Sequence, residues 1–391
     1  MLKSPLTSEA VFSGEDFIAV RNPVVLPAKI PCERTPLGIQ GDYKPCIAKL
    51  KNGTLLIIAM YARQDPWSEY FCCFRSTDGG LTWSERGELD GPVGREPFIG
   101  VLSDGTLIMT SHILPHDANN EEPDAAEKHY WYSYVHRSTD DGLTWDSHRI
   151  GKEDGFLPSG KGTCTDRKPV ELPDGTVLLG VSSGQADGMK TAMWRSRDFG
   201  RTWDKSTDCE LEGWNDMDGF YSNSDTFLAP DGKLWHVNRV DGNNHPIEGT
   251  PPPSNLDSFD YTILWESEDE GRTWSNRGLM GYYCDHYGFF VNLHDGRILY
   301  NWTVRDAYPP LGIQAIIMDN DGGGWDFHRD RIIVESRTNM DANNGKPWGG
   351  GYGSTIQLDD GTLLTPYCYQ TSDNRAAYEG FRLEVVRWSL P

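Results

Sequence analysis

The most constraining feature of the sequence is an eight-residue pattern, Ser-x-Asp-x-Gly-x-Thr-Trp, that the chain repeats. Four full copies occupy residues 76–83, 138–145, 196–203 and 267–274, and a degenerate copy ends at Trp325. The Asp carboxylate can accept hydrogen bonds from nearby backbone N–H groups, as in an Asx turn. Gly tolerates a positive φ, and Trp buries a large aromatic face. Each copy therefore predicts a self-capped turn between strands, and the repetition indicates a repeat architecture.

A second repeat alternates with the first. It consists of an apolar run, an Asp-Gly or Asn-Gly turn and another apolar run, which is the strongest short-range signal of a β-hairpin. The turns are Asn52-Gly53, Asp104-Gly105, Asp174-Gly175, Asp231-Gly232, Asp295-Gly296 and Asp360-Gly361. They are 52 to 70 residues apart, which suits one four-stranded unit each. We therefore predict an all-β chain that forms a single six-bladed β-propeller over residues 1–391, with the first blade near 43–90 and the last near 350–391.

The last blade lacks a strand of its own. No fourth strand follows the final apolar run, Phe381 to Trp388. An N-terminal strand at about residues 16–26 is expected to supply the missing edge, because closing the ring removes an exposed sheet edge.

Composition limits the partners and the location. The formal net charge of −22 argues against nucleic acid or an anionic membrane as a partner, and no run of 18 apolar residues predicts a membrane span. Because the N-terminus has no apolar signal core, we expect a cytoplasmic protein, with secretion after removal of a leader as the alternative. The eight cysteines form no Cys-x-x-Cys pair and are expected to be mostly buried free thiols.

Ionisable side chains gather where the innermost strands are expected to begin. In a propeller these strand starts meet at one end of the central channel. Counting back from each hairpin turn gives Tyr43-Lys44, Arg95-Glu96, Arg167-Lys168, Ser222-Asn223, Asp285-His286-Tyr287 and Tyr352. Five of the six groups carry ionisable side chains at positions where strands usually begin with apolar ones. We therefore predict a ligand site at this mouth.

The repeated pattern resembles the Asp-box (BNR) repeats of the sialidase superfamily. The resemblance implies a sialidase-like propeller and an exo-acting glycosidase for an acidic or decorated glycan, with hydrolysis favoured over elimination. It implies Tyr352 as nucleophile and Asp65, in the loop after the second strand of the first blade, as acid, with Glu69 as a substitute. It also implies Arg239 and Arg305 as ligands of the substrate's anionic group.

Two departures from the family pattern affect the chemistry. Lys44 stands near the place of the family's first arginine, and an ammonium cannot hold a carboxylate through two parallel hydrogen bonds as a guanidinium can. Asn223 stands where the family has the glutamate that activates the tyrosine, so Asp225 or Asp285 would have to supply the base. Lys44, Arg95, Glu96, Arg167 and Tyr287 complete the expected substrate-binding set.

Two other functions stay open. In a polysaccharide lyase, His286 and Tyr287 would move the protons of an elimination, while Arg95, Arg167 or Lys168 neutralises a uronate carboxylate. A non-catalytic propeller would use the same ring of groups to bind a sugar. We expect a carbohydrate partner and no cofactor. We also expect no metal site, because His112 and His116 flank Pro115 in a loop and not on a helix.

Overall fold

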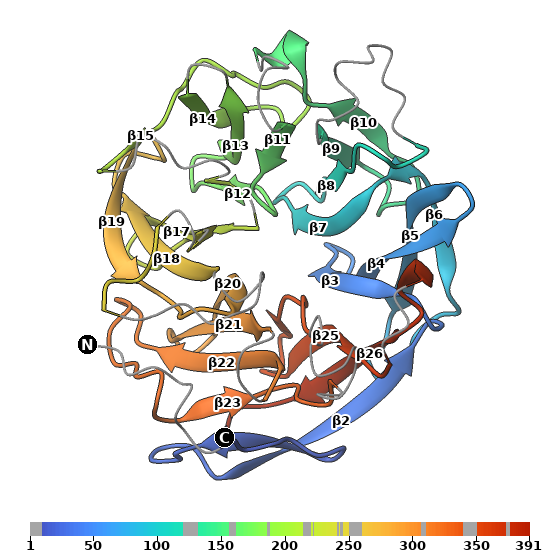
Figure 1. Ribbon diagram of the computed structural model, residues 1–391, viewed down its shortest axis with the longest axis vertical. Helices are drawn as coiled ribbons and strands as arrows, with labels where there is room; N and C mark the ends of the chain where they lie inside the picture. Colours follow the sequence, from blue (N-terminus) through green and yellow to red (C-terminus); the bar gives the residue numbers. More distant parts are fainter. Residues whose placement is uncertain are drawn as a thin grey trace.

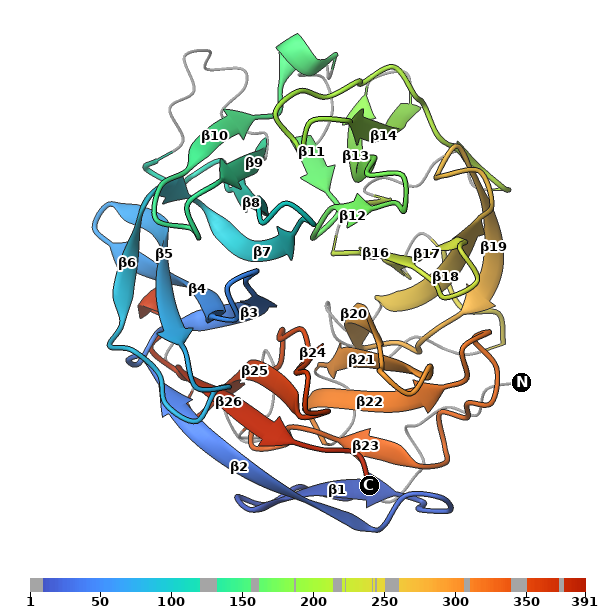
Figure 2. The same ribbon diagram turned by 180° about the vertical axis from the view of Figure 1, so that it is seen from behind.

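The computed structural model describes residues 10–119, 132–155, 162–185, 188–213, 220–221, 223–240, 242, 245–249, 260–305, 310–338, 350–372 and 376–391. Regular structure in these residues is β-strand, apart from two short 3-10 helices, η3 (Lys152–Asp154) and η5 (Ala376–Tyr378). No helix among the described residues is long and apolar enough to cross a membrane. The sheets surround a central axis, so the chain forms a β-propeller, as the sequence predicts (Figures 1 and 2).

The strands follow one another in groups around the ring, and neighbours within a group pair antiparallel except for one short parallel pair between residues 210–211 and 273–274. The first two groups are β3 (Tyr43–Lys49), β4 (Leu55–Gln64), β5 (Trp67–Ser76) and β6 (Gly87–Val93), then β7 (Arg95–Val101), β8 (Leu107–Ile113), β9 (Tyr132–Ser138) and β10 (Asp146–Arg149). The next two are β11 (Gly162–Thr165), β12 (Val170–Glu171), β13 (Val177–Gln185) and β14 (Gly188–Ser196), then β15 (Glu210–Leu211), β16 (Asp225–Leu228), β17 (Leu234–Val240), β18 (Tyr261–Ser267) and β19 (Thr273–Leu279). The last two are β20 (Asp285–Asn292), β21 (Ile298–Val304), β22 (Gly312–Met318) and β23 (Arg331–Ile333), then β24 (Ile356–Gln357), β25 (Leu363–Gln370) and β26 (Phe381–Trp388).

Two N-terminal strands, β1 (Phe17–Arg21) and β2 (Lys29–Leu37), close the ring. β2 pairs with β26, whereas β1 pairs with β2 and with β23 of the preceding group. Figures 1 and 2 show both strands along the outer rim. Pairing through β1 merges the last two groups into one nine-stranded sheet, so the described strands form five sheets and the count of six blades stays a prediction.

The prediction that residues 16–26 form the strand that closes the last blade is therefore wrong. The next strand along the chain, β2, pairs with β26 instead. Asn22 has a positive φ of 49°, and Pro23 has no N–H to continue the ladder. The Asp330 carboxylate then accepts hydrogen bonds from the N–H groups of Val24 (2.7 Å) and Leu26 (3.0 Å), which holds this stretch as a turn. The chain reverses there, and β2 supplies the strand that pairs with β26.

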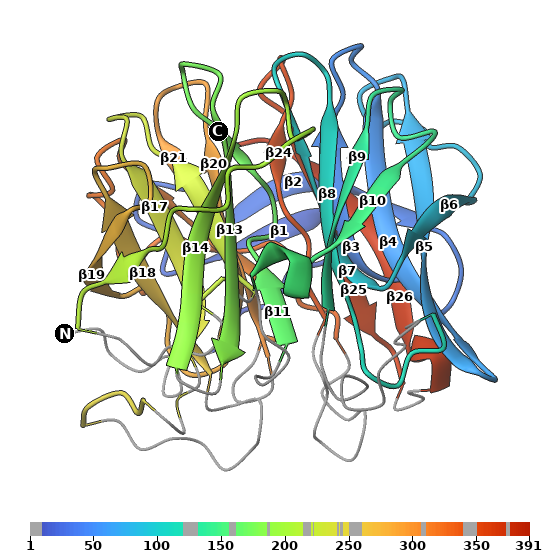
Figure 3. The ribbon, with the colours of Figure 1, turned by 90° about the horizontal axis from the view of Figure 1, so that it is seen from above.

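The six predicted hairpin turns are confirmed. Each joins the two innermost strands of a group, and its Gly has a φ between +83° and +98°. At the first turn, the Gly53 N–H donates to the Leu50 carbonyl (2.9 Å) and the Asn52 side chain accepts from the Thr54 N–H (2.9 Å). Because six copies of one turn begin each repeat, the inner strands of all groups run the same way between the two ends of the ring (Figure 3).

The four boxes also form the predicted turns. In the third box, Asp198 Oδ1 accepts from the Thr202 N–H (2.8 Å) and from the Ser196 hydroxyl (2.8 Å). The Ser196 Oγ accepts in turn from the Gly200 N–H (2.8 Å). The boxes at Asp78, Asp140 and Asp269 repeat these bonds. None of the four aspartates lines the pocket described below.

The core lies between neighbouring sheets. Fully buried aromatic side chains, among them Trp194, Trp265 and Trp302, fill these spaces. All eight cysteines are free thiols, as expected, but only Cys46, Cys72, Cys284 and Cys368 are buried and the other four are partly exposed, so half and not most of them are core thiols.

Candidate active site

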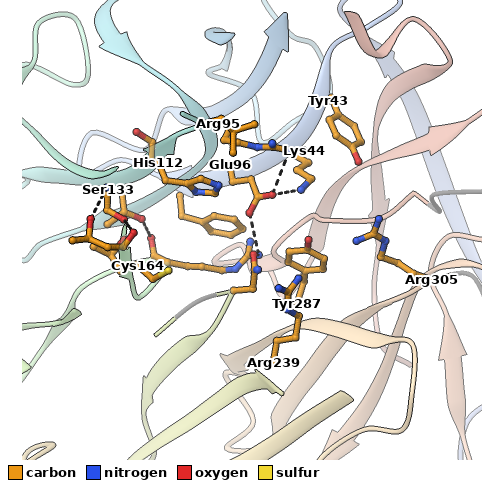
Figure 4. Close-up of a pocket in the computed structure, with 18 residues that line it drawn as sticks. Tyr43, Lys44, Arg95, Glu96, His112, Ser133, Cys164, Arg239, Tyr287 and Arg305 are labelled. Atoms are coloured by element: carbon orange, nitrogen blue, oxygen red, sulfur yellow. Dashed lines mark hydrogen bonds and ion pairs between the residues drawn. The ribbon is translucent and has the colours of Figure 1, made fainter. Parts of the chain in front are cut away.

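A pocket of about 240 Å³ opens where the innermost strands begin (Figure 4). It is lined by Tyr43, Lys44, Arg95, Glu96, Phe98, Thr110, Ser111, His112, Leu114, Ser133, Thr163, Cys164, Thr165, Arg167, Asn223, Arg239, Tyr287 and Arg305. All seven side chains that the sequence assigned to substrate binding are in this set. The strand starts therefore converge as predicted.

A recurring backbone distortion aims several of these side chains inward. The ladders of β3, β7 and β20 each skip register directly after the strand start. The extra residue has a positive φ, which is 47° at Lys44, 53° at Glu96 and 54° at Tyr287. Asn223 (54°) and Tyr352 (67°) have the same conformation in the segments that lead into β16 and β24. Bulges at the rim of a sheet re-aim a side chain, and a non-Gly residue persists in this region only where its surroundings hold it there, at about 1–3 kcal/mol.

Cations dominate the pocket wall. Lys44, Arg95, Arg167, Arg239 and Arg305 come from five different segments of the chain. Among the described lining residues, Glu96 is the one carboxylate. The pocket therefore carries an excess of positive charge, although the net charge of the whole protein is −22.

Glu96 is surrounded by three of the cations. It forms an ion pair with Lys44, and its oxygens lie 3.9 Å from Arg95 Nη2 and 4.0 Å from Arg167 Nη2. Burial alone would raise the pKa of Glu96, but Lys44 and the two arginines hold this pKa well below its usual value. Glu96 is therefore an anion that cannot donate a proton near neutral pH.

Arg167 is fixed between two aromatic rings. Its Cζ lies 4.2 Å from the ring centroid of Phe98 and 4.5 Å from that of Tyr287, both within cation–π range. Its Nη2 donates to Asn223 Oδ1 (2.9 Å). The amide of Asn223 thus orients a guanidinium, at the position where the family pattern has a glutamate.

Arg239 and Arg305 form another part of the wall. Arg239 lies on β17, and its Nε is 3.3 Å from Asp260 Oδ2. The backbone N–H of Arg305 donates to the Cys284 carbonyl (2.9 Å) just after β21 ends. In Figure 4 both guanidinium groups lie on the side of the pocket away from His112 and Ser133.

His112 lies at the end of β8, opposite Arg95 in the strand register. Burial lowers the pKa of His112 to about 3, so its imidazole is neutral near neutral pH. The sequence analysis considered His112 only as a metal ligand together with His116 and did not assign it to the substrate site. The signal was present: β8 pairs antiparallel with β7, so its last residues lie beside the charged start of β7.

Tyr352 is adjacent to the pocket but does not line it. Its side chain is 1% exposed, and its ring centroid lies 4.5 Å from Lys44 Nζ and 5.5 Å from Arg305 Cζ. The ring also packs edge-on against Tyr287 at 4.7 Å. Burial raises the pKa of Tyr352 well above its usual value, so the phenol is protonated.

Three other predicted catalytic residues lie apart from the pocket. Asp65 is exposed at the tip of the β4–β5 hairpin, because the two strands carry it beyond the strand starts. Asp285 is fully buried and accepts hydrogen bonds from Trp302 Nε1 (3.0 Å) and the Tyr282 N–H (2.9 Å), which is a structural role. His286 is also fully buried, since it precedes the bulge that turns Tyr287 toward the pocket.

The two carboxylates named as substitutes are engaged elsewhere. Glu69 is fully buried, accepts the Tyr378 hydroxyl proton in a hydrogen bond and lies 3.8 Å from Arg95 Nε, so it supports Arg95 from behind. Asp225 pairs with Lys168 (2.5 Å) and accepts from the Phe290 N–H (3.1 Å). Ser222 lies outside the described residues.

Comparisons with known proteins agree on the fold. The sequence profile of the BNR repeat-like domain matches residues 36–281, while no curated protein sequence matches the chain. A Dyadobacter fermentans protein of unknown function is 17% identical, with a TM-score of 0.60 over 98% of this chain and 97% of that one. The Trypanosoma rangeli sialidase is 15% identical, with a TM-score of 0.58 over 97% of this chain and 57% of that one. The Ruminococcus gnavus intramolecular trans-sialidase is 13% identical, with a TM-score of 0.56 over 91% and 96%.

Proposed function

Because this chain belongs to the BNR repeat-like domain family and has the sialidase-like fold, we propose that it is an enzyme that cleaves glycans at a sugar carrying a carboxylate. The proposal covers the site and the class of substrate. It takes the pocket at the strand starts as the place where the acidic sugar binds.

The observation that carries the proposal is the charge of the pocket. Five cationic side chains and one carboxylate line it among the described residues. Glu96 offsets part of the positive charge next to Lys44, Arg95 and Arg167, and Asp260 lies 3.3 Å from Arg239 Nε. The cations still outnumber these two carboxylates, so an anionic group can bind beside Arg239 and Arg305. Planar guanidinium groups suit a carboxylate because they can donate two parallel hydrogen bonds.

Two solved structures with a similar fold support an anionic ligand in the pocket. The Trypanosoma rangeli sialidase was solved with 2,3-difluorosialic acid, and the Ruminococcus gnavus enzyme with oseltamivir carboxylate. At identities of 15% and 13% these structures support the comparison of folds, and the substrate of this chain stays a proposal.

Sialidase-type hydrolysis is the chemistry expected from the sequence. Tyr352 lies next to Lys44 and Arg305, and these two cations would stabilise a phenolate. The route also needs the buried Tyr352 hydroxyl to become accessible, and an acid other than Asp65. Hydrolysis therefore stays a prediction.

One substrate panel tests the proposed function. Chromogenic sialosides and uronides report hydrolysis through release of the chromophore. Uronate disaccharides linked at O4 of the uronate report elimination through the ultraviolet absorbance of the unsaturated product, and calorimetry measures binding of each sugar. Either cleavage supports an enzyme for acidic glycans. Binding without cleavage would mean a carbohydrate-binding propeller, and neither binding nor cleavage would contradict the proposal altogether.

A further inference from the structure

The pocket also indicates how the bond is broken. Resting on the proposed function, we propose that the chain cleaves uronate glycans by β-elimination, with His112 as the base and Tyr287 as the acid. The inference replaces His286 of the sequence-based lyase hypothesis by a histidine that lines the pocket.

The described lining residues do not supply the acid that glycoside hydrolysis needs. Glycoside hydrolysis needs a group that protonates the leaving oxygen, which is a carboxylic acid in most families, although sialidases use a tyrosine and not a second carboxylate as the nucleophile. Glu96 is the one lining carboxylate, and its ion pair with Lys44 and the nearby Arg95 and Arg167 keep it ionised. A carboxylate held in this way can accept hydrogen bonds from sugar hydroxyls but cannot protonate a leaving group.

His112 is the one histidine among the described residues that line the pocket. It lies on β8, beside Glu96 and across the pocket from Arg239 and Arg305 (Figure 4). Its imidazole is neutral because burial lowers the pKa of His112 to about 3. A carboxylate substrate brings a negative charge into the pocket, which raises the proton affinity of the imidazole relative to the empty state.

Tyr287 is placed to give up a proton. Its ring centroid lies 4.5 Å from Arg167 Cζ and 5.3 Å from Lys44 Nζ. Both distances are within cation–π range, so the two cations hold the ring of Tyr287 at the pocket wall. Figure 4 shows that Tyr287 and His112 reach the same pocket from different elements, β20 and β8, as an acid and a base on two sides of a sugar require.

The proposed step balances without a cofactor. Arg239 and Arg305 neutralise the uronate carboxylate, which acidifies the adjacent C5–H bond. His112 takes the C5 proton, the released electron pair forms the C4–C5 double bond, and the C4–O4 bond breaks. The leaving oxygen takes the phenol proton of Tyr287. Proton exchange with water then restores the imidazole and the phenol.

Three substitutions and one control test the proposal on a uronate disaccharide linked at O4. His112→Ala and Tyr287→Phe should each lower kcat for unsaturated product by about 100-fold or more, the usual range for a lost proton-transfer group. Added imidazole should restore part of the His112→Ala rate, which a merely structural histidine would not allow. His116→Gln, an exposed histidine outside the pocket, should keep the wild-type rate. Tyr352→Phe is assayed beside them.

The outcomes separate this inference from the proposed function. Chromophore release from uronides or sialosides with no unsaturated product would overturn elimination and leave an enzyme for acidic glycans. A larger loss in Tyr352→Phe than in Tyr287→Phe, with all variants folded by circular dichroism, would overturn the assignment of the acid. A wild-type protein that binds no acidic sugar would overturn both proposals.

Discussion

Single residues set the chemistry of this mouth through an unusual backbone. Lys44, Glu96 and Tyr287 each have a positive φ directly after a strand start, where a residue with a side chain is rarely found. The conformation turns a side chain that would alternate across the sheet toward the channel. The repeated distortion shows why charged residues occur at these strand starts, because their side chains face the pocket and not the core.

If Arg305 binds the substrate's carboxylate as proposed, affinity should depend on the shape of its guanidinium group and not only on its charge. Arg305→Lys keeps the cation but loses the fork of donors that matches a carboxylate. We expect Kd for an acidic sugar to rise roughly tenfold, a loss of about 1.4 kcal/mol, with kcat changed much less. Calorimetry and steady-state kinetics measure the two effects. An unchanged Kd would show that Arg305 does not contact the anionic group.

A buried carboxyl beside the pocket should make stability depend on pH. Burial raises the pKa of Asp166 to about 7, and Ser224 Oγ donates to its Oδ1 (2.8 Å). The folded state thus holds a proton that the unfolded chain releases near pH 4. Stability from this group is fully present below about pH 4 and is lost as pH rises toward 7, by up to about 1.4 kcal/mol per pH unit. Asp166→Asn should remove this slope in denaturant titrations. If the difference in unfolding free energy between the wild type and the variant is the same at every pH from 4 to 7, the assignment to Asp166 is contradicted.

At the scale of elements, the local signals predicted the fold well. An Asn-Gly or Asp-Gly turn and a box specify their conformations within eight residues, so the hairpins were predictable. The closing strand was not, because the choice between 16–26 and 29–37 depends on Asp330, a distant residue that caps the turn between them. His112 and the buried position of Tyr352 were missed for a related reason: they depend on pairing and packing between strands, which no local pattern encodes.

The boxes should affect stability and not binding. Asp198 accepts hydrogen bonds from the Thr202 N–H, the Thr202 hydroxyl and the Ser196 hydroxyl. These bonds hold the pKa of Asp198 at about 2, below the value near 4 of an unfolded chain. Their stabilisation is present above about pH 4 and is lost as pH falls through 2. Asp198→Ala should therefore lower the melting temperature at pH 7 while sugar affinity stays unchanged. A variant that is as stable as the wild type but binds sugar less tightly would refute a purely structural role.

At the scale of the molecule, a buried polar cluster ties the N-terminal strand to the end of the chain. Arg34 on β2 donates to the Tyr367 hydroxyl (2.7 Å) and to the Val334 carbonyl (2.9 Å). Tyr367 in turn donates to Glu384 on β26, and Glu335 lies 3.7 Å from Arg34. Arg34 bridges the last two groups of strands. Closure of the ring by β2 should therefore depend on this buried charged side chain.

Breaking this cluster should destabilise the whole ring. Removing one partner of a buried charged network typically costs about 3–5 kcal/mol, because the other charges stay buried. Arg34→Met should lower the free energy of unfolding by about that amount and expose the amides of β2 and β26 to hydrogen exchange together. Exchange that is unchanged in β26 would show that closure does not depend on Arg34.

The central claim is that an acidic sugar binds at the strand starts through its carboxylate. The most direct measurement compares, by calorimetry, the binding of glucuronate and of its methyl ester to the wild type and to the Arg239→Gln, Arg305→Gln double variant. The two ligands differ in charge and hardly in shape. The account predicts that the wild type prefers glucuronate by at least about tenfold, that the preference weakens with salt, and that the double variant loses it. Equal affinity of the wild type for both ligands, or a preference that survives loss of both arginines, would contradict it.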